Sequence, residues 1–216
     1  MNKLILDCSA GMSVMLCKDD EVFFKVDENQ KKHTDELLLT VDKLLEDAGI
    51  SVADLDVIGV CVGPGSFTGV RVAISICKGL AIGTNARVVQ VSNFDLYSQN
   101  LTDGFVVLEG FSNYVYVRKI VDGKVEDSCE DLTEFASKFR DEYAGFKVVV
   151  GNEKTQNLLK NNEISSIIGQ KEVISCINSK IDKNEFVDIN QILPVYLRAS
   201  QAEIERNKKL GGNGNG

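Results

Sequence analysis

Short apolar stretches separated by polar turns predict three consecutive strands at the start of the chain. The stretches run from Lys3 to Cys8, from Ser13 to Cys17 and from Glu21 to Val26, and each is rich in Leu, Ile, Val or Phe. Short turns at Ala10-Gly11 and Lys18-Asp19-Asp20 join them. Because such short connections are typical of antiparallel neighbours, we expect a meander.

The next apolar residues recur at helical spacing and predict a helix from about Thr34 to Ala48, which Gly49 ends. A near-continuous apolar run from Asp56 to Val62 then predicts a strand that is buried on both faces. Helical spacing returns in a second predicted helix, from about Phe67 to Ile82.

The order of these elements predicts a mixed α/β sheet covered by helices. A strand from Arg87 to Val91 and a helix from Asn93 to Asn100 complete the order β-β-β-α-β-α-β-α. Three antiparallel strands followed by strands with helical crossovers give a sheet that contains both antiparallel and parallel pairs.

From Leu101 the pattern restarts in a shorter and more polar half, and residues 162–190 show no clear pattern. Strands are predicted at 105–109, 113–120, 124–127 and 146–150, and helices at 132–143 and 154–161. We therefore expect an N-terminal lobe of residues 1–100, to which a C-terminal helix can return. A reduced C-terminal lobe of residues 101–210 follows, and then a flexible tail at 211–216.

Composition and charge narrow the class of protein. With 216 residues, 44% of them hydrophobic, the chain is long enough to bury a core without disulfides. It carries 24 Lys and Arg against 32 Asp and Glu, a net charge of −8, so a role near nucleic acid would need a basic partner or a local basic patch. Because the apolar stretches are too short to span a membrane and the start lacks a signal-peptide pattern, we expect a cytoplasmic protein with no membrane partner.

The six cysteines are spread along the chain without any Cys-x-x-Cys pair. Four of them, Cys8, Cys17, Cys61 and Cys77, lie in apolar runs, where a free thiol behaves as a small hydrophobe. We expect buried, reduced thiols rather than disulfides or metal ligands.

The single histidine, His33, cannot by itself form a zinc site with two histidine ligands. Thr34 follows it, so the His-Glu-x-x-His arrangement of metalloproteases is absent. No metal site and no catalytic residue is therefore predicted on this chain.

Four segments together resemble the TsaB (YeaZ) family. They are Ile5 to Ser9, His33 to Leu38, Val62 to Gly83 and Pro194 to Arg198. The most specific of them is the sequence Gly-Pro-Gly-Ser-Phe-Thr-Gly-Val-Arg, which begins at Gly63. The resemblance implies a two-lobed ASKHA fold, of the RNase H-like and actin-like ATPase type, with a reduced second lobe.

The same resemblance implies a function in making threonylcarbamoyladenosine at position 37 of tRNA. In that machinery TsaD is the catalytic subunit and TsaE is a third member. The chain would then be a non-catalytic subunit that forms a heterodimer with TsaD, or a homodimer through the same helices when it is alone. We expect ATP and metal on the partner subunits, no cofactor on this chain, and contact with tRNA only through the complex.

The glycine-rich sequence from Gly63 has more than one interpretation. Backbone amides at such a turn can hold a phosphate, and Asp7, at the end of the first predicted strand, lies where ASKHA ATPases hold metal and phosphates. Asp7, Gly63, Gly65 and Ser66 would then form a vestigial nucleotide site or, in a different class of function, the site of an active ATP-dependent phosphotransferase. The structural interpretation is a tight turn in which Ser66 caps the following helix.

The second predicted helix is apolar on two sides. One side would pack on the sheet, and it consists of Phe67, Val70, Ala73, Ile74, Cys77, Leu80 and Ala81. The other is a seam of small or β-branched residues, Gly69, Val72, Ile76, Gly79 and Gly83. Residues of this kind let another helix approach closely, so we expect the partner protein to bind this seam unless the first helix covers it. Arg71 and Lys78 are expected to be solvated charges.

Overall fold

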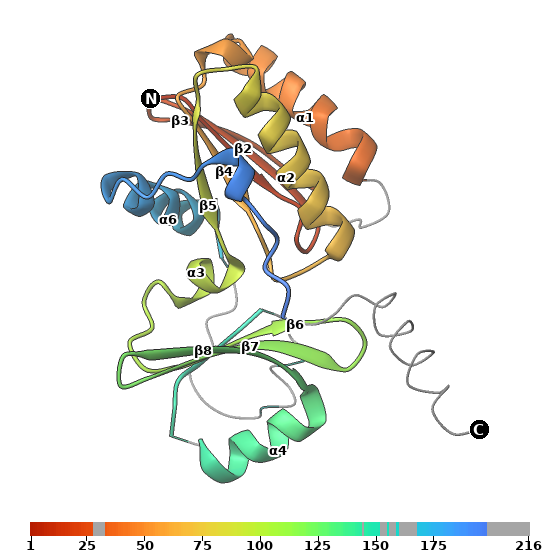
Figure 1. Cartoon of the computed structure of the whole chain (residues 1–216), viewed down its shortest axis with the longest axis vertical. Helices are drawn as coiled ribbons and strands as arrows, with labels where there is room; N and C mark the ends of the chain where they lie inside the picture. Colours follow the sequence, from red (N-terminus) through yellow and green to blue (C-terminus); the bar gives the residue numbers. More distant parts are fainter. Residues whose placement is uncertain (28–32, 144, 152–154, 156–158, 160–167, 198–216) are drawn as a thin grey trace, which may run out of the picture.

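The computed structural model of the chain contains two β-sheets with helices packed on them (Figure 1). It describes residues 1–27, 33–143, 145–151, 155, 159 and 168–197. The first sheet has five strands and the second has four, and each contains both antiparallel and parallel pairs. The predicted mixed α/β class is therefore confirmed.

The first sheet has the spatial order β3-β2-β1-β4-β5. Its strands are β1 (Lys3–Asp7), β2 (Met12–Lys18), β3 (Glu21–Asp27), β4 (Val57–Cys61) and β5 (Arg87–Val91). β2 pairs antiparallel with both β1 and β3, whereas β4 pairs parallel with β1 and β5. The antiparallel meander expected from the short turns is present, and β1 lies at the centre of the sheet.

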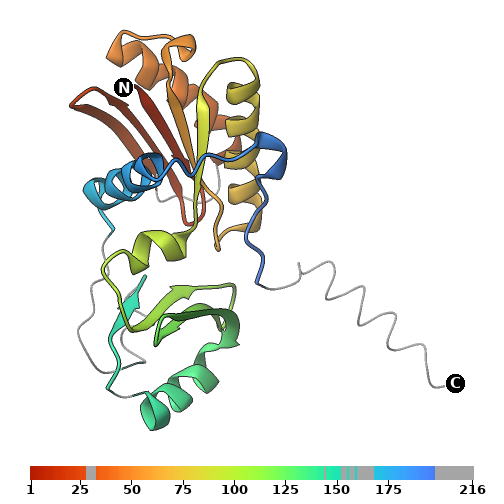
Figure 2. The ribbon, with the colours of Figure 1, turned by 60° about the vertical axis from the view of Figure 1, so that its left-hand side comes forward.

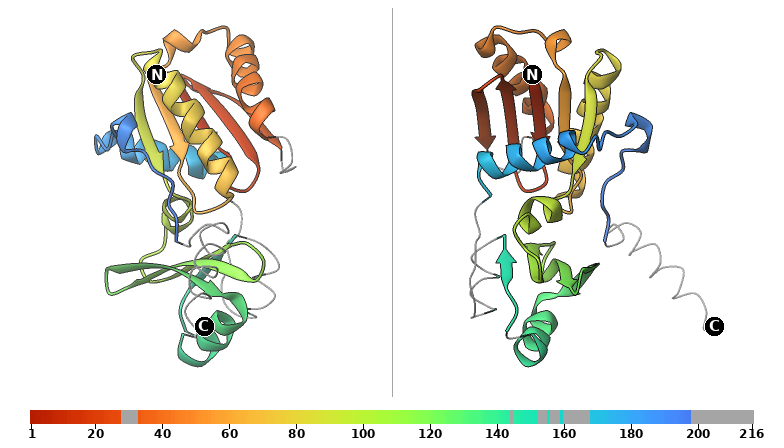
Figure 3. Two further views of the ribbon diagram at one scale, coloured as in Figure 1. Left: turned by 45° about the vertical axis from the view of Figure 1, so that its right-hand side comes forward. Right: turned by 90° about the vertical axis from the view of Figure 1, so that its left-hand side faces the viewer.

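Helices α1 (His33–Ala48) and α2 (Phe67–Ile82) cover one face of the first sheet. The main hydrophobic core lies between them and the sheet, where Leu4, Leu6, Val41, Ala73 and Cys77 are all buried. Figure 3 shows these two helices on one side of the strands and a third helix, α6 (Gln170–Asp182), on the other.

Helix α6 is an element that the sequence pattern did not predict. Its buried residues Cys176 and Ile177 pack on the second face of the first sheet, together with Ile5 and Val89. A side chain at Gly59 in β4 would place its Cβ 2.8 Å from Cδ1 of Ile177, so this glycine makes room for the helix. A signal was present in the sequence, because Val173, Ile177 and Ile181 recur at intervals of four.

The second sheet has the order β8-β7-β6-β9 and is covered by α4 (Leu132–Glu142). Its strands are β6 (Gly104–Glu109), β7 (Tyr114–Val121), β8 (Lys124–Asp131) and β9 (Val148–Val150). Phe105 of β6 and Phe139 of α4 meet edge to face, with ring centroids 5.4 Å apart. The short helix α3 (Asn93–Ser98) lies between the two sheets (Figure 2).

The structure differs from the predicted boundaries at several places in the second half. Strand β8 continues past residue 127 to Asp131 because it stays paired with β7 as far as Tyr114. Two short 3-10 helices, Val52–Asp54 and Ile189–Gln191, were not predicted. The predicted helix at 154–161 and the predicted tail at 211–216 lie outside the described residues, except for Thr155 and Leu159.

A network of charged side chains joins the second sheet to α3 and α6. Arg118 of β7 donates from Nε and Nη2 to the carboxylate of Asp127, at 2.8 Å each, and from Nη1 to Asp95 of α3 at 3.1 Å. Lys180 of α6 lies 3.6 Å from the same Asp95 carboxylate. The network therefore links β7 to β8 through the Asp127 carboxylate, and β7 to α3 and α6 through the Asp95 carboxylate.

The cysteines are reduced, as predicted, because none of the six forms a disulfide. Five of them are buried, and Cys129 is half-buried. Burial raises the pKa of Cys8 and of Cys77 to about 12, so these thiols stay protonated and unreactive at neutral pH. Within the described ranges, no helix combines the length and apolar character needed to cross a bilayer.

Candidate functional site

The glycine-rich turn between β4 and α2 packs its backbone against the residue that follows Cys8. The amide of Ser66 donates to the carbonyl oxygen of Ser9 at 2.6 Å. A Cβ added at Gly65 would lie 2.5 Å from that same oxygen. Gly63 adopts a φ of +91°, a conformation that glycine reaches without a steric cost. The contact with the chain after β1 therefore explains Gly65, and the positive φ explains Gly63.

Ser66 is the N-cap of α2, as the structural interpretation of this sequence expects. Its Oγ accepts a hydrogen bond from the amide of Gly69 at 3.2 Å, which satisfies one of the free donors at the start of the helix.

Asp7 lies beside the same turn, half-buried at the end of β1. Its Oδ1 accepts from the amide of Ser9 at 2.8 Å. The side-chain amide of Asn93 donates to Ser9 Oγ and to the carbonyl oxygen of Pro64, both at 2.8 Å. The structure thus brings Asp7 and the glycine-rich turn together around Ser9. In the part of the chain that the structure describes, no three His, Cys, Asp or Glu side chains are grouped so that they could hold a metal ion.

Gly69 does not lie on the outer side of α2, so its assignment to the partner-binding seam is wrong. It is buried, and a Cβ added there would lie 2.0 Å from the carbonyl oxygen of Cys8. The physical reason for this glycine is the close approach of the first turn of α2 to the end of β1.

The other four predicted seam residues lie partly or wholly in contact with solvent. Val72 and Ile76 are half-buried and pack against the main core with one side. Gly79 is exposed, and an added Cβ would meet no atom within 4 Å. Gly83 is also exposed, and its nearest neighbours would be two carbonyl oxygens of its own helix, at 3.7 and 3.8 Å. The exposed side of α2 is therefore notched at two glycines.

The exposed side of α2 differs from the predicted seam. It is a row of residues at intervals of four. We call this row the α2 ridge, and it consists of Phe67, Arg71, Ser75, Gly79 and Gly83. Beside it, Ile82 is 74% exposed. Phe67 was predicted on the buried face but is 39% exposed, because the close approach of Gly69 to Cys8 turns the side of the helix that carries Phe67 outward.

Tyr196 lies against the first turn of α2 although it is far from it in the sequence. Its ring stacks on Phe67 with the centroids 5.1 Å apart, and its hydroxyl accepts from Nε of Arg71 at 2.6 Å. The guanidinium carbon of Arg71 lies 3.7 Å from the centre of the Phe67 ring. Arg71 is exposed, as expected of a solvated charge, and it also packs on Phe67 and bonds to Tyr196. No periodic pattern in the sequence predicts this contact. Arg198, two residues after Tyr196, lies outside the described residues.

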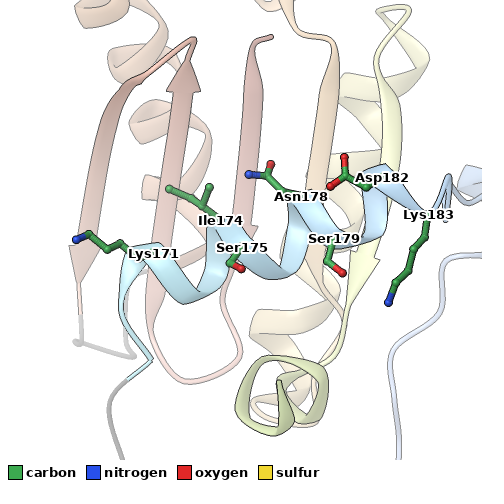
Figure 4. Close-up of a pocket in the computed structure, with 7 residues that line it drawn as sticks. All are labelled: Lys171, Ile174, Ser175, Asn178, Ser179, Asp182 and Lys183. Atoms are coloured by element: carbon green, nitrogen blue, oxygen red, sulfur yellow. The ribbon is translucent and has the colours of Figure 1, made fainter. Parts of the chain in front are cut away.

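A hollow of about 570 Å³ lies along α6, away from the α2 ridge (Figure 4). Its lining consists of six residues of that helix and the residue that caps its C-terminal end: Lys171, Ile174, Ser175, Asn178, Ser179, Asp182 and Lys183. Buried Lys3 donates from Nζ to Oδ1 of Asn178 at 2.8 Å. None of the residues predicted from the sequence as functional lines this hollow.

Comparison with known proteins places these features in a family. Residues 27–137, just over half of the chain, match the family model described as TsaD, tRNA N6-adenosine threonylcarbamoyltransferase. The chain is 32% identical to the tRNA threonylcarbamoyladenosine biosynthesis protein TsaB of Haemophilus influenzae over 49% of this chain and 46% of that protein. It is 36% identical to the Escherichia coli TsaB over 46% of this chain and 43% of that protein. The chain thus spans less than half the length of these two relatives.

Longer matches are more distant. The Bacillus subtilis protein of the same name is 23% identical, and the match covers 95% of this chain and 97% of that protein. The structure of YeaZ from Pseudomonas aeruginosa superimposes with a TM-score of 0.70 at 21% identity, over 91% of this chain and 99% of that one, which supports a shared fold. The chain therefore belongs to the family of TsaD, tRNA N6-adenosine threonylcarbamoyltransferase, as a relative of the TsaB (YeaZ) proteins.

Proposed function

We propose that this chain is a non-catalytic subunit that binds TsaD, together with TsaE, in the formation of the threonylcarbamoyl group on adenosine 37 of tRNA. The names of its relatives support a role in threonylcarbamoyladenosine biosynthesis. The match to the TsaD model supports the proposal that chain and partner share a fold. Structural likeness of this kind favours a pair of similar helices packing on each other.

The observation that carries the proposal is the exposed, glycine-notched side of α2. At Gly79 and Gly83 the helix backbone is bare, so a partner helix can approach it closely. Ile82, 74% exposed, stands beside this notch. Burying such a side chain stabilises an interface by about 1.5–3 kcal/mol. In the absence of TsaD, the same surface would pair two copies of this chain.

The glycine-rich turn supports a structural rather than a catalytic role for this chain. Gly65 is explained by its contact with Ser9, and the Ser66 amide is already bonded to Ser9. ATP and metal would then act on the partner subunits, with no cofactor on this chain. Because the net charge is −8, tRNA would be reached through the complex rather than by this chain alone. A division into lobes near residue 100 stays a prediction.

The test is a pull-down with purified TsaD from the same organism, using Gly79→Leu. A Cβ at this position meets no atom of the chain, and leucine is a better helix former by roughly 1 kcal/mol, so the variant should fold and melt no lower than the unaltered chain. Binding of TsaD should nevertheless be lost, because the larger side chain keeps the partner helix away from the notch.

Gly145→Leu is the matched control, since an added Cβ there also meets nothing within 4 Å and the position lies next to α4, away from α2. This variant should bind TsaD normally. Retention of full TsaD binding by Gly79→Leu would contradict the proposed use of α2.

A further inference from the structure

The guanidinium of Arg71 is held in place by its neighbours, but only part of its hydrogen-bond donors are used. It lies over the Phe67 ring at 3.7 Å and 5.4 Å from the centre of the Tyr196 ring, and its Nε donates to Tyr196. Arginine carries five N–H donors. Neither Nη atom of Arg71 has a hydrogen-bond or ion-pair acceptor among the residues that the structure describes.

Arg118 of the same protein is an example of a guanidinium group whose nitrogen atoms all have carboxylate acceptors. It uses Nε and Nη2 together on one carboxylate and Nη1 on a second. The chain has 32 acidic residues, yet none in the described ranges serves Arg71 in this way. Within the described ranges, the two Nη groups of Arg71 are therefore left for a bidentate acceptor, which we look for on another molecule.

The cluster is rigid because its aromatic members are anchored on both sides. Phe67 starts α2, whose next turns are buried on the sheet. Tyr196 follows Val195, whose amide donates to the carbonyl oxygen of Val62 at 2.8 Å, and it precedes Leu197, which packs against the core around Phe94. An arginine immobilised in this way loses little side-chain entropy on binding. Anchored aromatic rings with an arginine are also enriched among residues that dominate binding energy.

We propose that Phe67, Arg71 and Tyr196 form a preorganised anchor for a carboxylate, an Asp or Glu side chain of the protein that docks on the α2 ridge. This inference rests on the proposed function and names the chemistry that the partner must present. Phe67 and Arg71 belong to the ridge itself, so the anchor and the glycine notch at Gly79 lie on one side of one helix.

A protein carboxylate fits this surface better than a nucleic-acid phosphate. Phosphate backbones are held by several cations at once, whereas the chain has a net charge of −8. The ridge continues from Arg71 with Ser75 and Gly79, which are small and uncharged and suit a closely packed helix.

The test is titration of the full chain against purified TsaD, with Arg71→Lys as the main variant. Lysine keeps the charge but loses the planar fork and the stacking, so affinity should fall about tenfold or more. Tyr196→Phe keeps the stacked ring and loses only the hydroxyl that orients Nε, so it should weaken binding by a few-fold. The affinity of the unaltered chain should also fall with added salt, because the proposed contact joins opposite charges.

Arg87→Lys is the matched control, because Arg87 also lies 3.7 Å from the centre of an aromatic ring, that of Phe186. It belongs to β5 and follows the C-terminal end of α2, whereas Phe67 and Arg71 lie in the first turns of α2. It should bind TsaD as the unaltered chain does. If Arg71→Lys and Tyr196→Phe both bind normally while Gly79→Leu does not, the anchor is refuted and the proposed function stands. If the unaltered chain fails to bind TsaD, both are refuted. If Arg71→Lys changes only self-association or tRNA binding, the carboxylate of a TsaD partner is the wrong occupant.

Discussion

Two glycines of α2, ten residues apart, should respond in opposite directions to the same substitution. Replacing either glycine by alanine favours the helix by roughly 1 kcal/mol. At Gly79 nothing opposes this gain, because the added Cβ meets no atom within 4 Å. At Gly69 the Cβ would lie 2.0 Å from the carbonyl oxygen of Cys8, and that backbone belongs to the end of the central strand β1 and cannot move aside cheaply.

Forcing an extra carbon into such a contact costs about 1–3 kcal/mol, and the backbone neighbour puts Gly69→Ala at the upper end. Because the helix-propensity gain is the same in both variants, the difference between them is this overpacking cost. For a chain of this length it corresponds to a separation of about 2–4 °C in melting temperature per kcal/mol. Urea denaturation of the two variants and the unaltered chain measures the difference. Equal stability of Gly69→Ala and Gly79→Ala would refute the packing of α2 against β1 that places Gly69 inside.

Two other predictions concern the charged network and the thiols. Arg118→Met should lower the free energy of unfolding by about 1–3 kcal/mol at neutral pH, as expected for losing hydrogen bonds between charged groups. Burial would raise the pKa of the Asp95 carboxyl, but the Ser92 amide, Lys180 and Arg118 outweigh it, so the pKa is lowered. A carboxyl with a lowered pKa stabilises the folded chain at pH values above its ordinary pKa of about 4, and this contribution is lost as the pH falls through the pKa of the folded state. The destabilisation caused by Arg118→Met should therefore become smaller below about pH 4. A pH-independent effect in urea titrations would show that the network does not act through charge. In thiol labelling of the folded chain, half-buried Cys129 should react first, whereas Cys8 and Cys77, with pKa values of about 12, should react only after unfolding. Labelling of Cys77 at the rate of Cys129, read by mass spectrometry, would contradict the packing of the core.

Most elements of the fold follow from local patterns. The apolar stripes predicted α1 and α2, and the short turns predicted the strands of the meander. Most predicted ends of these elements lie within one or two residues of the observed ends. α6 was missed because only a few of its residues are apolar. The polar residues of its outer face, which include Lys171, Ser175 and Ser179, weaken the helical pattern of apolar positions. Its burial depends on a sheet face that the sequence does not display.

The candidate site was predicted in part. The sequence identified α2 as a helix with one apolar side for the sheet and a second side that could contact a partner. Gly79 and Gly83 are exposed on that second side. It placed Gly69 outside and Phe67 inside, and both assignments were wrong. It could not bring Tyr196 to Arg71, because 125 residues separate them and no repeat or spacing links the two segments.

The sequence by itself determined the order of the strands and helices of the first sheet up to α3, the two apolar sides of α2 and the family resemblance. Helical periodicity fixes the angles between residues around one helix, but it does not fix how that helix is rotated about its own axis against the sheet. Only the tertiary structure decided that rotation, through the contact of Gly69 with the carbonyl oxygen of Cys8. That contact turns Phe67, Arg71 and Gly79 outward. Hydrogen bonding of the segment at Val195 to Val62 then brings Tyr196 beside them.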